Sequence, residues 1–336
     1  MKPLFVLVLL FCSPAVFLLQ GSRARTISTP PAVLRVMGLP AQPLAITVAL
    51  GQGLFAKYGV EVQAQVAANS EELRSALAGG TTDLAHAAVD NAVALVEKAR
   101  VDVVVVMGGE GSTNELIVQP SIHSFADLRG QTMIVDAPTT AYALQLKKIL
   151  LLGGLQADRD YQIKAVGSTP LRLAAMREHK EYAASILGPP ASLVAKHEGF
   201  ISLGATQQFI GPYQGAGAFA RRQWVTENRE LVTSYLAAFI EAQRWILNPA
   251  HKAEVIALLQ KEFKLSSALA EESYDAWVVA PGGMEADAKI NLEGFTNVLR
   301  LRAEIEHTWS GETPRPEKYY DPSYYDAALL KLSPTN

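Results

Sequence analysis

Two threonines stand where a short apolar segment gives way to a helical pattern. The apolar segment covers residues 132–135, and the turn that follows it carries Thr139 and Thr140. Apolar side chains then recur at helical spacing from Tyr142 until a Gly-Gly pair ends the pattern. A helix that begins directly after a strand presents backbone N–H groups without helical partners. This turn is therefore a candidate site for an accepting or anionic group of a ligand.

The other residue types that could do chemistry lack the spacing that the chemistry needs. The six histidines show no metal-ligand spacing, and Ser112 lacks the Gly-x-Ser-x-Gly pattern of a nucleophile elbow. Residues 51–56 resemble a dinucleotide fingerprint but lie in a helical pattern instead of following a strand, which favours a turn. We therefore expect no metal and no cofactor. A Ser/His/Asp set assembled from distant residues is left open.

Composition and charge narrow the class of protein. The 336 residues are 49% hydrophobic and 19% charged, which is typical of a globular protein long enough for two domains. The formal net charge is −3, so the chain has no general attraction for polyanions. We expect no nucleic-acid partner.

The first 24 residues have the layout of a secretory signal. Lys2 precedes an apolar stretch at 4–19, and the small residues Ser22 and Ala24 suit cleavage after Ala24. We expect a signal peptide at 1–24 and an exported, periplasmic protein. A retained anchor and lipidation at Cys12 are the alternatives. Cleavage would remove Cys12, the single cysteine, and with it any thiol chemistry.

Strand and helix patterns alternate through most of the chain. We expect strands at 33–37, 60–66, 83–88, 101–107, 116–118, 133–135, 162–166, 182–187, 201–203 and 217–220. We expect helices at 45–58, 70–78, 91–99, 142–152, 169–178, 190–197, 226–247, 250–262, 266–277 and 290–307. Such alternation predicts an α/β fold whose mostly parallel sheets are flanked by helices.

The alternation falls into two blocks, at about 33–118 and 119–212, so we expect two sheets. Ligands of open α/β sheets bind beyond the carboxyl ends of the strands. The loops expected there are 38–44, 88–91, 108–112, 137–141 and 188–190. We expect them to share one cleft between the two blocks.

Three stretches carry a family resemblance. They are MGLP at 37–40 with ALGQGLFAKYGVEV at 49–62, DLRG at 127–130, and WVTENRELV at 224–232. In this order they resemble periplasmic substrate-binding proteins of the nitrate/sulfonate/taurine ABC-transporter type, which are related to thiamine-pyrimidine binding proteins. The resemblance covers about residues 33–305.

The resemblance implies a bilobal type II periplasmic-binding-protein fold. Lobe 1 would comprise 33–118 plus 213–336, and lobe 2 would comprise 119–212. The chain would cross between the lobes near 119–120 and 211–215, and the lobes would close on a ligand.

The resemblance and the turn at 137–141 together suggest a set of ligand-binding residues. They are Pro40, Gln42, Asp90, Asn91, Thr139, Thr140, Ala141 and Pro189. Two of them depart from the family pattern. Gly188-Pro189 stands where many relatives carry an aromatic-acidic pair, and Asp90 stands where small polar residues are common. A carboxylate there favours a neutral or zwitterionic organic ligand or a donor-rich heterocycle over a bare oxyanion. Asp90 capping the helix at 91–99 is the alternative.

The function expected from these observations is non-catalytic. The protein would capture a small organic molecule between its lobes and deliver it to an ABC permease in the inner membrane, acting as a monomer. One alternative is an enzyme like the thiamine-pyrimidine synthases, whose cysteine-rich motif is absent here. Another is a ligand-binding sensor or adaptor domain with a membrane receptor as its partner.

Overall fold

The computed structural model describes residues 32–40 and 43–332, which lie in one compact unit. The expected signal peptide with its cleavage site at Ala24, and the candidate residue Gln42, lie outside the described residues. Among the residues that are described, no helix combines the length and the apolar character needed to cross a membrane.

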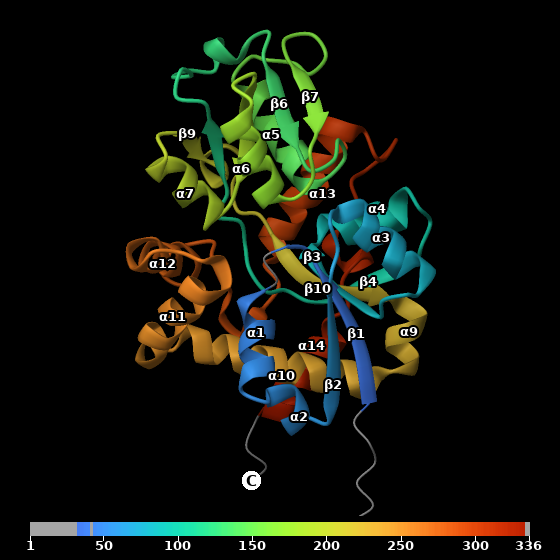
Figure 1. Ribbon diagram of the computed structural model, residues 1–336. Helices are drawn as coiled ribbons and strands as arrows, with labels where there is room; N and C mark the ends of the chain where they lie inside the picture. Colours follow the sequence, from blue (N-terminus) through green and yellow to red (C-terminus); the bar gives the residue numbers. More distant parts are fainter. Residues whose placement is uncertain (1–31, 41–42, 333–336) are drawn as a thin grey trace, which may run out of the picture. The chain divides into compact units, whose positions relative to one another are not determined.

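The first sheet combines four parallel strands with one antiparallel strand. Its order is β2 (Val60–Val66), β1 (Ala32–Gly38), β3 (Leu84–Ala88), β10 (Ala216–Arg221) and β4 (Val103–Met107). β1 pairs parallel with β2 and β3, whereas β10 runs antiparallel to β3 and β4 (Figure 1). β4 reads VVVVM and is buried throughout, as expected for a β-branched strand covered on both faces.

The second sheet repeats this plan. Its order is β7 (Gln162–Ala165), β6 (Thr132–Val135), β8 (Tyr182–Leu187), β5 (Glu115–Val118) and β9 (Ile201–Ala205). Here β5 is the antiparallel strand. Two mostly parallel sheets flanked by helices are what the alternation predicts, so the expected fold class is confirmed.

The position of β5 corrects one expected boundary. A division at residue 118 puts this strand in the first block, but it pairs with β8 and β9 in the second sheet. The chain therefore changes sheets within residues 108–114, before β5, and not near 119–120. The apolar run of β5 is three residues long, too short to reveal which strands it joins.

Helices cover the faces of both sheets. Around the first sheet lie α1 (Leu44–Gly51), α2 (Leu54–Lys57), α3 (Ser70–Gly79), α4 (Asp90–Glu97), α9 (Arg222–Glu227), α10 (Arg229–Leu247) and α14 (Pro322–Leu332). Around the second lie α5 (Ala141–Leu152), α6 (Thr169–Glu178), α7 (Ala191–His197) and α8 (Thr206–Ile210). The remaining helices are α11 (Lys252–Phe263), α12 (Ser267–Tyr274) and α13 (Leu292–Glu306), with short 3₁₀ or π segments at Ala126–Leu128, Pro249–His251, Asp275–Val279, Ala286–Ala288 and Pro316–Lys318.

Local sequence explains where several helices begin and end. The Asn69 side chain accepts hydrogen bonds from the backbone N–H groups of Glu71 and Glu72 at the start of α3. The helix expected at 45–58 is divided into α1 and α2, because Gly53 has a φ of 68° and interrupts the helical backbone. Residues 52–53 of the fingerprint-like stretch form a turn, whereas the residues on either side of them belong to α1 and α2.

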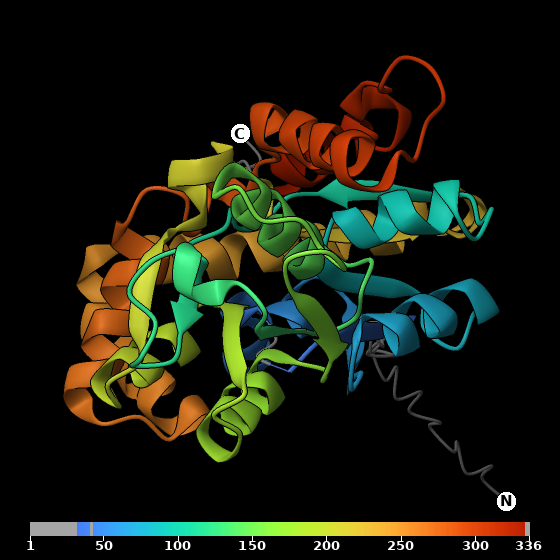
Figure 2. The same ribbon diagram turned by 90° about the horizontal axis from the view of Figure 1, so that it is seen from above.

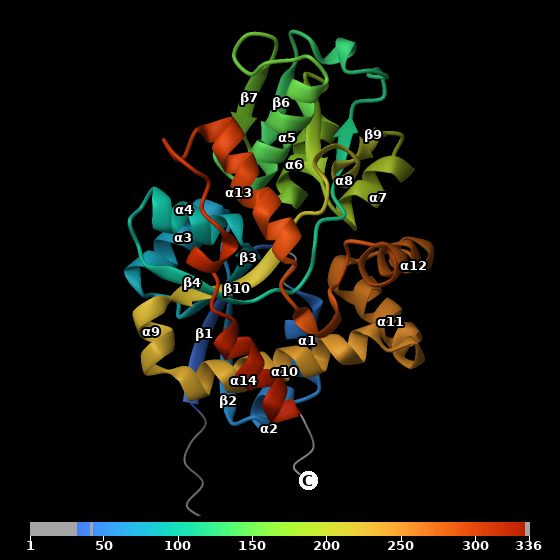
Figure 3. The ribbon, with the colours of Figure 1, turned by 180° about the vertical axis from the view of Figure 1, so that it is seen from behind.

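Helix α13 packs against elements of both sheets (Figure 3). Its buried residues Val298 and Leu299 belong to the same apolar core as Leu73 of α3 and Leu144 of α5. Seen from above, α13 lies beside α4 (Figure 2). The sequence assigns this helix to lobe 1 alone, whereas in the structure it contacts α4, which flanks the first sheet, and α5, which flanks the second.

Candidate functional site

A cavity of about 860 Å³ lies between the two sheets. Its wall includes residues from each of the five loops expected at the carboxyl ends of strands, together with residues 262–269 between α11 and α12. Its volume lies within the range of pockets that hold small organic ligands. The shared cleft predicted from the loop positions is thus present in the structure.

Three of the predicted site residues line this cavity: Pro40, Ala141 and Pro189. Asp90, Asn91, Thr139 and Thr140 do not. A ligand-binding role for the first three stays a prediction.

The two threonines at the start of α5 serve the fold. The Thr140 hydroxyl is buried and donates to the Asp136 carboxylate and to the backbone oxygen of Ala137, the latter at 3.0 Å. The Thr139 carbonyl accepts from Nη2 of Arg302 at 3.1 Å. The Thr140 hydroxyl thus has its partners within the fold, and a ligand-binding role for the Thr139 hydroxyl stays a prediction.

Asp90 does not cap α4, and its side chain is engaged within the fold. Its carboxylate is completely buried and accepts hydrogen bonds of 2.5 and 2.8 Å from Nε and Nη2 of Arg302 in α13. Helix α4 has no side-chain cap at its N-cap residue, Val89. The neighbouring Asn91 donates to the Ala88 carbonyl at 3.2 Å and accepts from Arg74 at 3.3 Å. These two residues hold α4 in place.

The sequence reasoning missed Glu110, which lines the cavity from the loop after β4. This loop is held closely on several sides. The Gly111 N–H donates to the Gly283 carbonyl at 2.9 Å, and Gln214 Nε2 donates to the Glu110 carbonyl at 3.1 Å. A Cβ on Gly111 would lie 2.6 Å from the Gly282 carbonyl oxygen, so only glycine fits there. The available signal was an acidic residue between glycines directly after a buried strand.

The Glu110 side chain is half-buried and its carboxylate is unpaired within the part of the chain that the structure describes. Its backbone carbonyl accepts the hydrogen bond from Gln214, but no hydrogen bond or ion pair involves the carboxylate among the described residues. Burial raises the pKa of this carboxyl to about 7. A carboxylate in such a place is costly until a donor or cation compensates it.

Apart from the exposed Glu262 and Lys264, the other polar groups of the cavity are neutral or already paired. The Ser112 hydroxyl is buried without a hydrogen-bond partner. Asn114 Nδ2 donates to Gln145 Oε1 at 3.4 Å. The His86 ring lies 2.8 Å from the Tyr235 hydroxyl, and burial lowers its pKa to about 3, so it is neutral near pH 7. Arg177 is neutralised by two hydrogen bonds of 2.7 Å to Glu198.

A second arginine lies close behind the cavity wall. Arg172 is completely buried and lies 4.4 Å from the ring centroid of Tyr142, which lines the cavity. Its Nη1 lies 3.8 Å from the Asp136 carboxylate, and burial lowers its pKa. Asp136 therefore balances the charge of Arg172.

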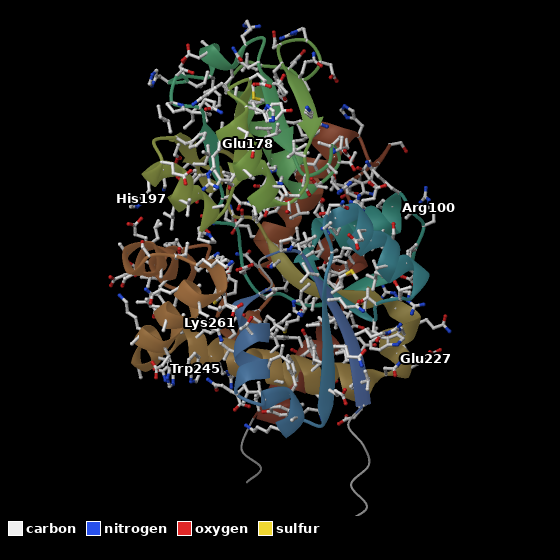
Figure 4. All side chains as sticks on the ribbon, in the orientation of Figure 1. Arg100, Glu178, His197, Glu227, Trp245 and Lys261 are labelled. Atoms are coloured by element: carbon white, nitrogen blue, oxygen red, sulfur yellow. The ribbon has the colours of Figure 1, made fainter. Side chains whose placement is uncertain are left out.

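Two polar contacts connect segments that are far apart in the sequence. His197 at the end of α7 has Nε2 3.0 Å from both carboxylate oxygens of Glu272 in α12 (Figure 4). Ser70 in α3 donates to Asp136 at 3.1 Å. No group of three or more metal-binding side chains occurs among the described residues.

Comparison with known proteins places this geometry in a family. Residues 38–260 match the NMT1-like family. No protein of curated function matches the chain in sequence.

Solved structures match over nearly the whole chain. The ligand-binding component of an ABC-type import system from Staphylococcus aureus, solved with zinc bound, is 16% identical with a TM-score of 0.71, covering 88% of this chain and 99% of its own. The periplasmic nitrate-binding protein NrtA from Synechocystis PCC 6803 is 16% identical with a TM-score of 0.73, covering 90% and 89%. The desulfurization enzyme DSZB is 13% identical with a TM-score of 0.61, covering 90% and 100%. These chains share the fold.

Proposed function

The chain belongs to the NMT1-like family, and on this premise we propose that it is a solute-binding protein that passes a small organic molecule to an ABC importer. The observation that carries the proposal is the cavity of about 860 Å³, walled by loops from both sheets. The name of the Staphylococcus aureus structure supports the same role. We propose two lobes built on the two sheets, with α13 between them.

We also propose that the protein does not catalyse a reaction. DSZB shows that an enzyme can have this fold, so the argument rests on the cavity itself. Ser112 has no hydrogen-bonding base, and the His86 ring is hydrogen-bonded to Tyr235. A nucleophile needs a base within hydrogen-bond reach, and these two side chains do not form such a pair.

Closure of the lobes on a ligand is the first testable consequence. Small-angle scattering should show a smaller radius of gyration once a compound that raises the melting temperature is added to saturation. The two chain crossings, at 108–114 and 211–215, permit this motion. An unchanged radius of gyration at saturation would contradict closure.

Export is the second consequence. We propose that the protein is periplasmic and that cleavage follows Ala24. N-terminal sequencing of protein from the native cell envelope should give a chain that begins at Arg25. Recovery of an intact Met1 from the cytosol would argue against export.

The partner decides between the importer and a sensor role. An ABC permease should co-purify from membranes with the liganded protein if the importer role is right. A membrane receptor in its place would favour the sensor or adaptor alternative.

A further inference from the structure

The cavity holds one half-buried carboxylate, that of Glu110, for which the described structure provides no hydrogen bond or ion pair. Glu110 projects from a loop that backbone hydrogen bonds fix to residues 283 and 285. The loop also accepts a 2.7 Å hydrogen bond from Gln243 Nε2 at the Gly109 carbonyl. These hydrogen bonds fix the backbone of Glu110 at the cavity wall.

The cations nearest the cavity wall are committed elsewhere. Arg177 pairs with Glu198, and Arg172 faces Asp136. Lys264 is exposed at the margin of the cavity. The rest of the wall is formed by hydroxyl, amide, aromatic and aliphatic groups, with a second acid, Glu262, exposed to solvent.

We infer that the molecule bound here carries a protonated amine, amidine or similar donor-rich cationic group that is held by the Glu110 carboxylate. The inference rests on the proposed binding function and names its substrate class. The buried Ser112 hydroxyl, two residues along the same loop, has no partner and is available to the same ligand. Aromatic and aliphatic residues, among them Tyr142, Phe263 and Trp277, suit an organic body attached to the cation.

A bare oxyanion fits this cavity poorly. Nitrate offers only acceptors, and an acceptor placed beside an unpaired carboxylate is repelled in a site of low dielectric constant. The nitrate-binding relative shares the fold at 16% identity, which leaves room for a different ligand. The structure therefore separates this chain from oxyanion binders through one residue in the loop after β4.

Matched probes of one shape test the charge preference. Benzamidine, benzamide and benzoate have nearly the same size but carry a positive, zero and negative charge. They are measured by calorimetry against the mature protein, beside a thermal-shift set of amines, neutral amides and alcohols, carboxylates and sulfonates. We expect benzamidine to bind at least tenfold more tightly than benzoate, about 1.4 kcal/mol, and the stabilising compounds to be mainly cations.

Glu110→Gln isolates the charge because the amide keeps the size and hydrogen-bonding capacity of the side chain. It should weaken benzamidine binding tenfold or more and change benzamide binding less than threefold. Glu178→Gln, an exposed acid at the end of α6 labelled in Figure 4, is the control and should leave both affinities unchanged.

The outcomes separate the two proposals. Stabilisation mainly by carboxylates or sulfonates, or benzamidine affinity that Glu110→Gln leaves unchanged, would overturn the cation assignment while the binding function stood. Absence of binding by every compound of every charge would overturn the binding function and the assignment with it.

Discussion

Replacing Arg302 by methionine lowers the free energy of unfolding by about 3–5 kcal/mol, because it leaves the Asp90 carboxylate buried without a partner. Arg302 also donates to the Thr139 carbonyl and contacts Glu306, so three acceptors lose their donor together. For a chain of 336 residues each kcal/mol lowers the melting temperature by about 1.5 °C. Thermal and urea unfolding of the purified variant measure the loss.

Two further variants show whether the buried charge is the cause. Arg300→Met removes an exposed arginine from the same helix, 3.9 Å from Glu304, and should change stability by less than about 0.5 kcal/mol. The double variant Arg302→Met with Asp90→Leu removes both buried charges and should regain much of the loss. A single Arg302→Met variant within 1 kcal/mol of the wild type would contradict this account.

Glu110→Gln stabilises the ligand-free protein at pH 8 and leaves it unchanged near pH 4.5. The pKa of the Glu110 carboxyl is raised to about 7 in the folded state, so the folded protein holds this proton more tightly than the unfolded chain does. Below the ordinary pKa of glutamate, the Glu110 carboxyl is protonated in both the folded and the unfolded state, so it does not change the free energy of unfolding. Wild-type stability is therefore lost as the pH rises from about 4.5 to about 7.

The expected gain at pH 8 is about 1–3 kcal/mol, which allows for the partial exposure of the side chain. Urea unfolding of wild type and variant at pH 4.5 and pH 8 measures it. His86 and Tyr142 do not titrate in this window, because burial lowers the pKa of His86 to about 3 and raises that of Tyr142. Glu178→Gln should show no pH-dependent difference. Equal stability of wild type and Glu110→Gln at pH 8 would show that the ionised Glu110 carboxylate does not destabilise the folded protein.

The fold could be predicted from the sequence because its signals are local. β4 is a β-branched run, and α3 has its cap, its acidic first turn and its terminal glycine within a dozen residues. The carboxyl-edge loops that line the cavity follow from this alternation. The partners of β5 could not be predicted, since three apolar residues carry no information about which strands lie beside them.

Which acid faces the cavity depends on contacts that are distant in sequence. Asp90 and Glu110 both lie just beyond the end of a strand of the first sheet, so local pattern does not distinguish them. Asp90 is buried because Arg302, 212 positions later, packs on it through α13. Glu110 is left unpaired because the segment at 282–284 approaches its loop only through backbone atoms. Neither contact can be predicted from the residues next to Asp90 or Glu110 in the sequence.

The guanidinium of Arg302 touches both halves of the molecule, bonding Asp90 beneath the first sheet and the Thr139 carbonyl at the start of α5. If the two halves rotate relative to each other about this buried guanidinium, residues close to it move least. Pairs of residues that are far from it and lie on opposite halves move most. The contact between His197 and Glu272 is exposed and connects α7 with α12. We therefore expect it to separate when the two halves open. Spectroscopic labels at His197 and Glu272 should report a large change in distance on opening, whereas labels beside Arg302 should report almost none.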